Sequence, residues 1–420
     1  MEEEEEEGSK KDNSLVSEAE AEAAAAAAAA ASLLTDDLIM EILSRLPVRS
    51  VHRFKCVCKR WRDLIACPAH REKLPQTLAG FLYTTYPGGY RHHLAAVSAA
   101  TVIDSVDASL AFLRPMNYTK IRLVDTCNGL LLCSCYNNNN EERLVVCNPA
   151  TQRWTELPPP PQPQPTTDYC AQHLAFDPAV SPSHFCVLDF EATVKEWHLT
   201  GVSIYSSRTR AWTHRDIGLV DKIVLVSGSV FVGGMLHLPG KLCKDGRNSI
   251  EDDDNFVLVL VDKECKAWKT VRAPRGFYSG AIGLSQECLH YVTRSPAPLT
   301  ILDDDNEDTL LLASEIAVWC LKDYDSREWV LKHTVRIDKL LNVIEKEYSV
   351  VGIHPDCDTI FFVTRGAYDG DSWDDASLAS WDMRRLEFRT VINLEKGSAG
   401  IYLPYVPMFS ESTLADGDDL

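Results

Sequence analysis

The chain has 420 residues, of which 45% are hydrophobic, and a formal net charge of −19. This length allows two or three domains with a sizeable core, and the acidic balance argues against a general nucleic-acid binder. The amino terminus is acidic where a signal peptide would be basic, and no apolar run is long enough to cross a membrane. The fourteen cysteines are scattered, often inside apolar runs. We therefore expect reduced thiols and a location in the cytoplasm and/or nucleus.

Residues 1–32 have a low-complexity sequence. Glu2–Glu7 form an unbroken glutamate run, and Ala23–Ala31 form an unbroken alanine run. Alanine favours helix, but a short helix without an apolar face is marginal in water. We therefore expect 1–32 to be a disordered acidic and alanine-rich tail with transient helix. We expect 410–420 to be a second, short acidic tail.

The segment 33–75 has the most informative pattern in the chain. Thr35 is placed to cap a helix, and Asp36 and Asp37 put negative charge near its positive end. Pro47 ends this helix. A second apolar set follows, interleaved with arginine and lysine. Helices this short leave apolar surface exposed unless a partner covers it. Six apolar residues recur at helical spacing and predict one stripe along the first helix: Leu34, Leu38, Ile39, Ile42, Leu43 and Leu46.

This segment resembles an F-box, a short helical motif of about forty residues. Thr35 departs from the family pattern, which more often has proline there, but both residues suit the start of a helix. The resemblance is carried by these residues: Leu34–Leu38, Glu41–Leu43, Arg45–Pro47, Val57–Lys59, Trp61 and Leu64–Ile65. It implies docking to the Skp adaptor of a cullin-based ubiquitin ligase. The residues it assigns to that docking are Leu34, Leu38, Ile42, Leu46, Pro47, Val57, Trp61, Leu64 and Ile65. The other interpretation is a helical hairpin packed on the rest of the chain.

Charge is distributed unevenly along the chain. Segment 33–75 holds nine Lys and Arg against five Asp and Glu, so it is near +4 while the remainder is near −23. A basic helical segment suits either a nucleic acid or an acidic protein partner. The F-box resemblance favours the protein, because the Skp adaptors of that family are acidic.

Residues 80–409 carry an internal repeat. Short apolar runs alternate with turns rich in Gly, Pro, Asn and Asp, which is typical of β structure. Five aromatic residues recur at separations of 58, 56, 61 and 59: Trp154, Trp212, Trp268, Trp329 and Phe388. Turn-forming residues stand six positions before them: Asn148, Ser206, Asp262, Asp323 and Asp382. A further apolar strand precedes most of these hairpins, which predicts a repeated unit of four antiparallel strands.

This unit indicates the blade of a β-propeller. The 330 residues divided by a mean separation of 58.5 give about 5.6 units, so the simplest ring has six blades. The sixth blade is then shared between Gly80–Ser98 and a strand around Ile401–Val406, which closes the ring. A β-sandwich is the alternative fold, and the even spacing argues against it. We expect the repeated aromatic residues to pack between neighbouring sheets.

The β region resembles the F-box-associated, kelch-like domain of plant F-box proteins. Cys127–Leu132, Asn148–Trp154 and the repeated hairpins carry this resemblance. The expected fold class is thus a small all-α F-box followed by an all-β, antiparallel propeller.

Motifs of catalysis and metal binding are missing from the sequence. We find no nucleophile elbow, no phosphate-binding glycine loop and no zinc-protease helix. Cys56 and Cys58 are too closely spaced for a zinc pair, and His92–His93 are expected in a turn. We expect no catalytic residue, cofactor or metal.

The leading hypothesis is a non-catalytic substrate receptor of a Skp–cullin–F-box ubiquitin ligase. The F-box would bind the adaptor and, through it, the cullin, while the propeller would hold a target protein. Neither nucleic acid nor membrane is an expected partner. The alternatives are a propeller enzyme with a helical assembly arm, and a scaffold that never promotes ubiquitylation. The target is unknown; three loops are where it is expected to bind: Thr85–His93, Lys241–Asp254 and Arg365–Asp375.

Overall fold

The structure is a computed structural model that describes residues 34–409 and Leu414. The gaps within that range are 47, 55–56, 68–69, 71–72, 75–76, 87–88, 98–105, 161–171, 193–197, 218–221, 227, 244–254, 275–280, 287, 298–312, 324–327, 337–346 and 366–375. The chain forms two compact units, Met1–Gln76 and Thr77–Leu420. The tails 1–32 and 410–420, apart from Leu414, lie outside the described residues, as does Pro47.

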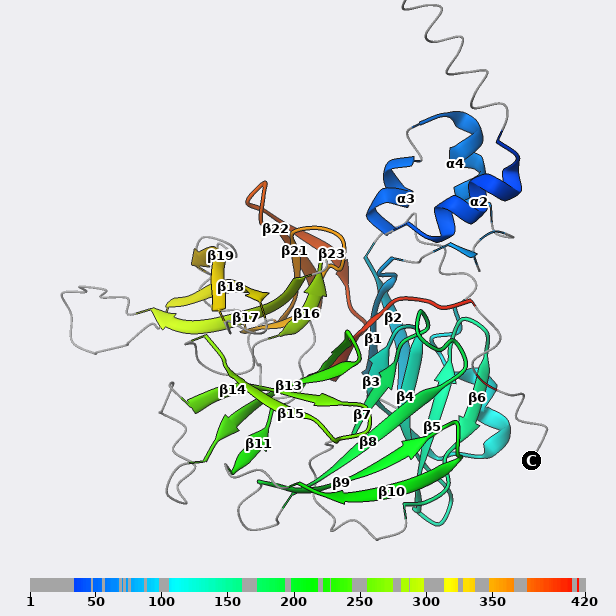
Figure 1. The fold of residues 1–420 in the computed structure, drawn as a ribbon. Coiled ribbons are helices and arrows are strands. Elements are labelled where there is room, and N and C mark those ends of the chain that lie inside the picture. The colour runs from blue at the N-terminus through cyan, green and yellow to red at the C-terminus, as the bar shows by residue number, and fades with distance from the viewer. Residues whose placement is uncertain are drawn as a thin grey trace, which may run out of the picture. The chain divides into compact units, whose positions relative to one another are not determined.

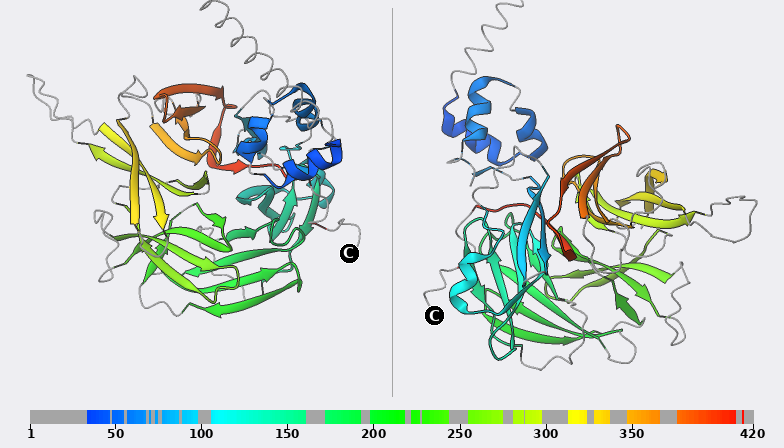
Figure 2. Two further views of the ribbon diagram at one scale, coloured as in Figure 1. Left: turned by 45° about the horizontal axis from the view of Figure 1, so that its top comes forward. Right: turned by 180° about the vertical axis from the view of Figure 1, so that it is seen from behind.

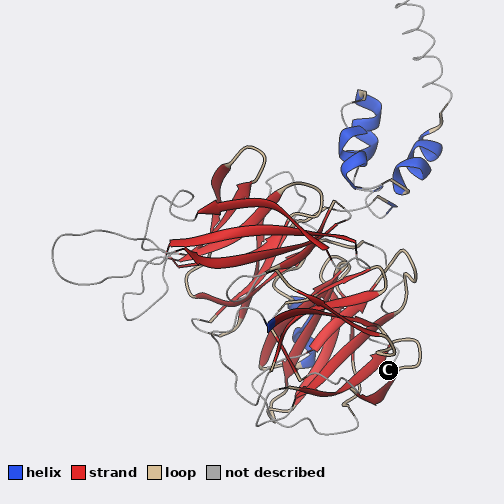
Figure 3. Cartoon of the chain, turned by 60° about the vertical axis from the view of Figure 1, so that its left-hand side comes forward, coloured by secondary structure: helices blue, strands red, loops and turns tan. Residues whose placement is uncertain are grey.

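The first unit is helical (Figure 1). It contains α2 (Asp36–Ser44), α3 (Val48–Phe54) and α4 (Lys59–Ala66). Figure 3, coloured by secondary structure, draws these helices in blue. Among the described residues, no helix has both the length and the apolar character that a membrane crossing requires.

The second unit is a six-bladed antiparallel β-propeller, which confirms the predicted fold class and blade number (Figures 1 and 2). Each blade is one sheet, and the inner strands of the six sheets surround a central hollow of about 420 Å³. A 3-10 helix, η2 (Ala111–Met116), precedes the first complete blade.

Blades one and two each have four strands in sequence order. They contain β3 (Lys120–Cys127), β4 (Leu130–Tyr136), β5 (Glu142–Asn148) and β6 (Arg153–Glu156), then β7 (Gln172–Phe176), β8 (Phe185–Ala192), β9 (Leu199–Ser206) and β10 (Ala211–Asp216). In blade three the inner strand is split in two, and both halves pair with the same neighbour. This blade contains β11 (Ile223–Leu225), β12 (Val230–Val232), β13 (Met235–Leu242), β14 (Phe256–Asp262) and β15 (Trp268–Arg272).

Blades four and five again have four strands each. They contain β16 (Ile282–Ser285), β17 (Cys288–Ala297), β18 (Ala313–Asp323) and β19 (Glu328–Arg336), then β20 (Glu347–Ile353), β21 (Thr359–Arg365), β22 (Ala376–Asp382) and β23 (Glu387–Asn393).

The sixth blade joins the two ends of the propeller sequence. Its order is β2 (Arg91–Ala96), β1 (Gly80–Thr85) and β24 (Ser398–Tyr405). Leu82 of β1 pairs with Leu403 of β24, far along the chain. The red strand β24 therefore lies beside the blue β1 in Figure 1. This confirms the predicted sharing of the last blade.

The repeated aromatic residues pack between neighbouring sheets, as predicted. Each of the five lies in an apolar cluster that joins its own blade to the preceding one. Two of them also tie the blades by hydrogen bonds: Trp212 Nε1 donates to the carbonyl oxygen of Pro158 at 2.6 Å, and Trp329 Nε1 to that of Arg272 at 2.8 Å. Their role is thus to hold the ring together.

The turn formers before these aromatic residues shape the outer hairpins. Asn148 Oδ1 accepts a hydrogen bond from the backbone N–H of Ala150 at 3.0 Å, and Asp382 Oδ1 accepts one from Arg384 at 2.9 Å. Gln152 completes the first hairpin with a positive φ of 59°. Side-chain acceptors of this kind replace the backbone partners that a tight turn leaves open.

The prediction for His92–His93 was wrong, because both residues lie on strand β2. His92 is buried, its Nδ1 lies 3.1 Å from Thr84 Oγ1 on β1, and burial lowers its pKa to about 4. His93 Nε2 similarly lies 3.0 Å from Thr85 Oγ1. The glycines of the preceding turn suggested that the turn extends further than it does. Both histidines therefore pair with threonines across two strands.

The cysteines of the described residues are free thiols, and half of them are buried. Burial raises the pKa of Cys265 to about 12 and of Cys127 beyond its ordinary range. Thiols of this kind act as small apolar side chains. No group of three or more His, Cys, Asp or Glu side chains within the described ranges is arranged to hold a metal ion.

Candidate protein-docking surface

Helix α2 begins at a capped end. Thr35 has extended backbone angles, and its Oγ1 accepts a hydrogen bond from the N–H of Leu38 at 3.4 Å. Asp36 and Asp37 lie in the first turn, where negative charge complements the helix dipole. Threonine thus caps the helix at the position where the F-box pattern more often has proline, so the departure leaves the helix start intact.

Arg60, in α4, holds the amino-terminal end of α2 in place. Arg60 Nη2 donates to the carbonyl oxygen of Leu34 at 2.8 Å and to Asp36 Oδ1 at 2.6 Å. Its Nε donates to the same carboxylate oxygen at 2.8 Å. The sequence pattern placed Asp36 only in the helix dipole, and missed that it also joins two helices. The basic residues interleaved with the second apolar set were the feature of the sequence that could have indicated this ion pair.

The predicted apolar stripe of α2 is divided between two faces. Ile39 and Leu43 are fully buried within the unit, whereas Leu38 is 52% and Ile42 42% exposed. Neighbouring residues of a helix point about 100° apart, so a set that includes both 38–39 and 42–43 cannot form one narrow stripe. One face builds the interior and the other remains open.

Part of the predicted docking set is buried or half-buried in the interior of the helical unit. Leu64 is buried, and Leu34, Leu46, Trp61 and Ile65 pack half-buried against the same cluster. The Trp61 ring lies 5.0 Å from the Phe54 ring, measured between centroids. Met40 and Leu74 also lie in this cluster, although the sequence pattern did not single them out.

Three members of the predicted set form the open apolar surface. Leu38 and Ile42 are one helical turn apart on α2, and Val57, in the turn before α4, is 59% exposed. The unit also exposes Arg53, Lys59 and Arg62, in keeping with its positive charge. Exposed apolar side chains on a positively charged unit fit a protein partner with an apolar groove and an acidic surface.

If the chain were a propeller enzyme, its catalytic residues would be expected in the central hollow. A serine, a histidine and an aspartate do meet there. Asp125 Oδ2 accepts hydrogen bonds from Leu174 N–H at 2.9 Å and from Ser229 Oγ at 3.3 Å, and Ser229 Oγ lies 2.9 Å from His173 Nδ1. In a nucleophilic triad the histidine stands between serine and aspartate. Here the serine donates its hydrogen bond to the aspartate, and His173 Nδ1, 3.7 Å from the same carboxylate oxygen, lies beside this bond and not between serine and aspartate. The group is a hydrogen-bonded link between three blades.

The sequence matches two protein-family models. One is described as the F-box domain and matches residues 32–70; the other is described as the F-box associated beta propeller domain and matches residues 90–351. The second match alone covers more than half of the chain.

Curated relatives come from Arabidopsis thaliana. F-box protein At5g07610 is 28% identical over 42% of this chain and 44% of its own length. Putative F-box protein At2g16220 is 24% identical over 78% of both chains. F-box/kelch-repeat protein At3g61590 is 26% identical over 43% of this chain and 45% of its own. The chain thus spans less than half of the first and third of these proteins.

Among solved structures, TolB from Acinetobacter baumannii is similar to this chain with a TM-score of 0.42 and 10% identity. The likeness covers 82% of this chain and 70% of that one. Agreement at this level supports no inference about function.

Proposed function

Because the chain belongs to the F-box proteins that carry an F-box-associated β-propeller, we propose that it is the substrate-receptor subunit of a Skp–cullin–F-box ubiquitin ligase. The observation that carries the proposal is the open apolar surface of the helical unit, formed by Leu38, Ile42 and Val57. Apolar side chains with this exposure gain free energy when a partner removes them from water.

The proposed division of labour follows from the two units. The F-box docks the Skp-type adaptor and, through it, the cullin, while the propeller holds a target protein. The whole predicted docking set takes part: the exposed members by contact, and the buried ones by fixing the helices that present them. Pro47 belongs to this set by resemblance only.

In this role the chain supplies no catalytic group. Holding a target lysine near a charged ubiquitin carrier raises its effective concentration. The Asp125–Ser229–His173 group supports a non-catalytic propeller, because its serine is a hydrogen-bond link. We further propose a location in the cytoplasm and/or nucleus, which the free cysteines of the described residues support.

The docking surface is tested by the double variant Leu38→Asp with Ile42→Asp. Both side chains are about half exposed, so the free protein should keep its fold. Adaptor affinity, measured by calorimetry, should fall on the order of 100-fold. Two half-exposed apolar contacts of about 1 kcal/mol each are lost, and the carboxylates that replace them lose hydration on binding.

A matched control uses two exposed apolar residues of the propeller. Leu386 is 71% and Ile392 41% exposed, so Leu386→Asp with Ile392→Asp makes the same chemical change elsewhere. This control should bind the adaptor like the parent chain. Unchanged affinity of the Leu38 and Ile42 variant would refute the docking surface.

A reconstituted assay tests the ligase role itself. Adaptor, cullin, ubiquitin carrier and a candidate target found by proximity labelling are combined with either the parent chain or the docking variant. Target ubiquitylation should require the parent chain. Adaptor binding without any ubiquitylation of bound targets would favour the scaffold instead.

A further inference from the structure

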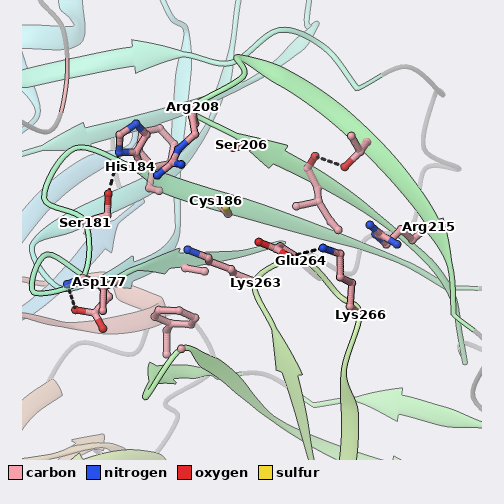
Figure 4. Close-up of a pocket in the computed structure, with 17 residues that line it drawn as sticks. Asp177, Ser181, His184, Cys186, Ser206, Arg208, Arg215, Lys263, Glu264 and Lys266 are labelled. Atoms are coloured by element: carbon pink, nitrogen blue, oxygen red, sulfur yellow. Dashed lines mark hydrogen bonds and ion pairs between the residues drawn. The ribbon is translucent and has the colours of Figure 1, made fainter.

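A cleft lies between blades two and three of the propeller, on the side of the outer hairpins. Its volume is about 290 Å³, and residues of β7–β10 line one wall while the hairpin between β14 and β15 lines the other. Its apolar lining includes Ala175, Phe185, Ile204 and Phe231. We call these apolar residues the floor of the cleft, and Figure 4 shows the polar side chains around them.

The loops that carry the polar side chains are held by their own hydrogen bonds. Asp262 Oδ1 accepts bonds from Lys266 N–H at 2.7 Å and Ala267 N–H at 3.2 Å, which fixes the hairpin that bears Lys263. On the facing wall, His184 Nδ1 lies 2.8 Å from Ser181 Oγ. The cleft is therefore largely formed before any ligand binds.

Positive charge dominates the rim. The cleft is lined by Arg208, Arg215, Lys263 and Lys266 against two carboxylates. Lys266 Nζ pairs with Glu264 at 2.7 Å, and Asp177 Oδ1 accepts hydrogen bonds from the backbone N–H groups of Ala179 and Val180. Both carboxylates of the cleft are thus engaged by the protein.

Three cations of the cleft lack a close anionic partner among the described residues: Glu264 pairs with Lys266, and it acts on Lys263 and Arg215 only from a longer distance. Within the part of the chain that the structure describes, Arg208, Arg215 and Lys263 make no ion pair, and all three are exposed. In a protein with a net charge of −19, such a local excess of unpaired cations is unusual. Unpaired arginines beside an apolar floor suit a ligand that brings its own carboxylates.

The cleft does not have the chemistry of a reactive site. Cys186 lies at its floor, half-buried, and burial raises the pKa of this thiol, so it stays protonated at neutral pH. His184 Nδ1 lies 2.8 Å from Ser181 Oγ and 2.9 Å from Ser183 Oγ, but no described carboxylate pairs with this histidine, so the group lacks the third member of a nucleophilic triad. Binding, not catalysis, is what this arrangement supports.

We propose that this cleft binds an acidic segment of the target protein, with carboxylates facing Arg208, Lys263 and Arg215 and an apolar side chain on the floor between them. The proposal rests on the substrate-receptor role, for which it names the target's chemistry. The cations are spread: Figure 4 shows Arg208 and Lys263 toward one end and Lys266 and Arg215 toward the other. Such spacing fits several carboxylates along an extended segment better than one phosphate group.

The test uses a fluorescein-labelled peptide of twelve residues in which six glutamates alternate with leucine and glycine. The same peptide with glutamine for glutamate is the uncharged reference. Fluorescence anisotropy with the full chain should show saturable binding of the glutamate peptide, at least tenfold tighter than the glutamine peptide and weaker at higher salt.

The cleft variant is Arg208→Glu, Lys263→Glu and Arg215→Glu. The matched control is Arg91→Glu, Lys332→Glu and Arg385→Glu, three exposed cations outside the cleft that give the same net charge. The cleft variant should lose at least tenfold in affinity for the glutamate peptide, and the control should stay within about twofold. Equal loss in both would mean that net charge alone attracts the peptide, and would overturn the proposal.

The chain itself contains a competitor of the same chemistry, the glutamate run Glu2–Glu7. A variant with glutamine at these six positions is therefore measured in parallel. Absence of binding to both proteins would refute the proposal. So would tighter binding of a single-phosphoserine peptide, or of a twelve-nucleotide single strand, that depends on the same three cations.

Failure of this proposal can be distinguished from failure of the ligase role. The Leu38→Asp, Ile42→Asp variant should bind the glutamate peptide like the parent chain, because its changes lie in the other unit. Conversely, the cleft variant should retain full adaptor affinity.

Discussion

The two units of the chain treat apolar side chains in opposite ways. In the helical unit, Leu38 and Ile42 remain about half exposed on a helix of nine residues. In the propeller, Leu130, Leu131 and Leu132 of β4 are all fully buried, because the sheet is covered on both faces by neighbouring blades. The propeller buries its apolar surface on folding, whereas the helical unit leaves part of its own exposed, where the proposed docking would cover it.

This difference separates the residues that determine stability from those that determine binding. Substitutions in the propeller core should change unfolding and leave adaptor affinity alone. Substitutions on the open face of α2 should do the reverse. The interior of the helical unit should affect both, since it positions that face.

Removing the strand that closes the ring should have the largest effect on the stability of the propeller. A chain ending at Gly397 lacks β24, so β1 loses a paired strand. The core cluster that joins blades six and one then loses Leu403 and the fully buried Tyr405. We expect the propeller's cooperative unfolding transition to disappear from calorimetry while the helical unit still binds the adaptor. A chain ending at Leu414 is the control. A transition within about 5 °C of the parent would contradict the closure mechanism.

Within α2, substitutions at one buried and one exposed position should differ most in their effect on stability. Leu43→Ala removes a fully buried side chain and should destabilise the helical unit by about 2–5 kcal/mol. Leu38→Ala, at a 52% exposed position, should change stability by no more than about 0.5 kcal/mol. Hydrogen exchange of the α2 amides measures both. Similar protection in the two variants would mean that the faces are not distinct.

The buried carboxyl of Asp189 in β8 makes propeller stability depend on pH. Burial raises its pKa to about 7, although Gln172 Nε2 lies 3.5 Å away and favours the ionised form; Glu142 and Glu191 raise it further. Between the ordinary carboxyl pKa and 7 only the folded state holds this proton, so stability falls as pH rises. From pH 5 to 8 the loss should be about 3 kcal/mol.

Asp189→Asn should remove that loss and make the variant more stable than the parent at pH 8. The buried His92, whose pKa is lowered to about 4, has the opposite effect, since it favours folding as pH rises from about 4 to 6.5. It is present in both proteins, so the difference between them isolates Asp189. Urea unfolding at pH 5 and pH 8 provides the comparison, and parallel pH profiles would rule out the buried proton.

The smallest expected effect concerns the helix cap. Thr35→Ala removes the acceptor of the Leu38 N–H and should destabilise the helical unit by about 1 kcal/mol. Thr35→Ser retains the hydroxyl and should restore most of the amide protection in the first turn. If serine protects no better than alanine, the hydroxyl does not cap this helix.

The propeller could be predicted because its signal repeats. One aromatic residue per hairpin, at nearly constant spacing, located five blades and left a remainder that only a shared sixth blade explained. The ring closure followed from arithmetic on the sequence. His92–His93 could not be placed in the same way, because neighbouring glycines mark a turn without marking its last residue.

The apolar residues of α2 could be predicted as a set, but the faces on which they lie could not. Spacing identified Leu38, Ile39, Ile42 and Leu43 as apolar, yet only the packing of α3 and α4 decides which two face inward. The cleft between blades two and three was invisible in the sequence, because Arg208 and Lys263 belong to different blades and meet only in the ring.

Pairing of β24 with β1 has a consequence for synthesis on the ribosome. Thr85 and Ser398 are 313 positions apart, so at 5–20 residues per second about 15–60 s pass before the first propeller strand meets its last partner. The helical unit is translated before all of this. The proposed adaptor could therefore bind the exposed apolar residues of this unit before the propeller on the nascent polypeptide has closed.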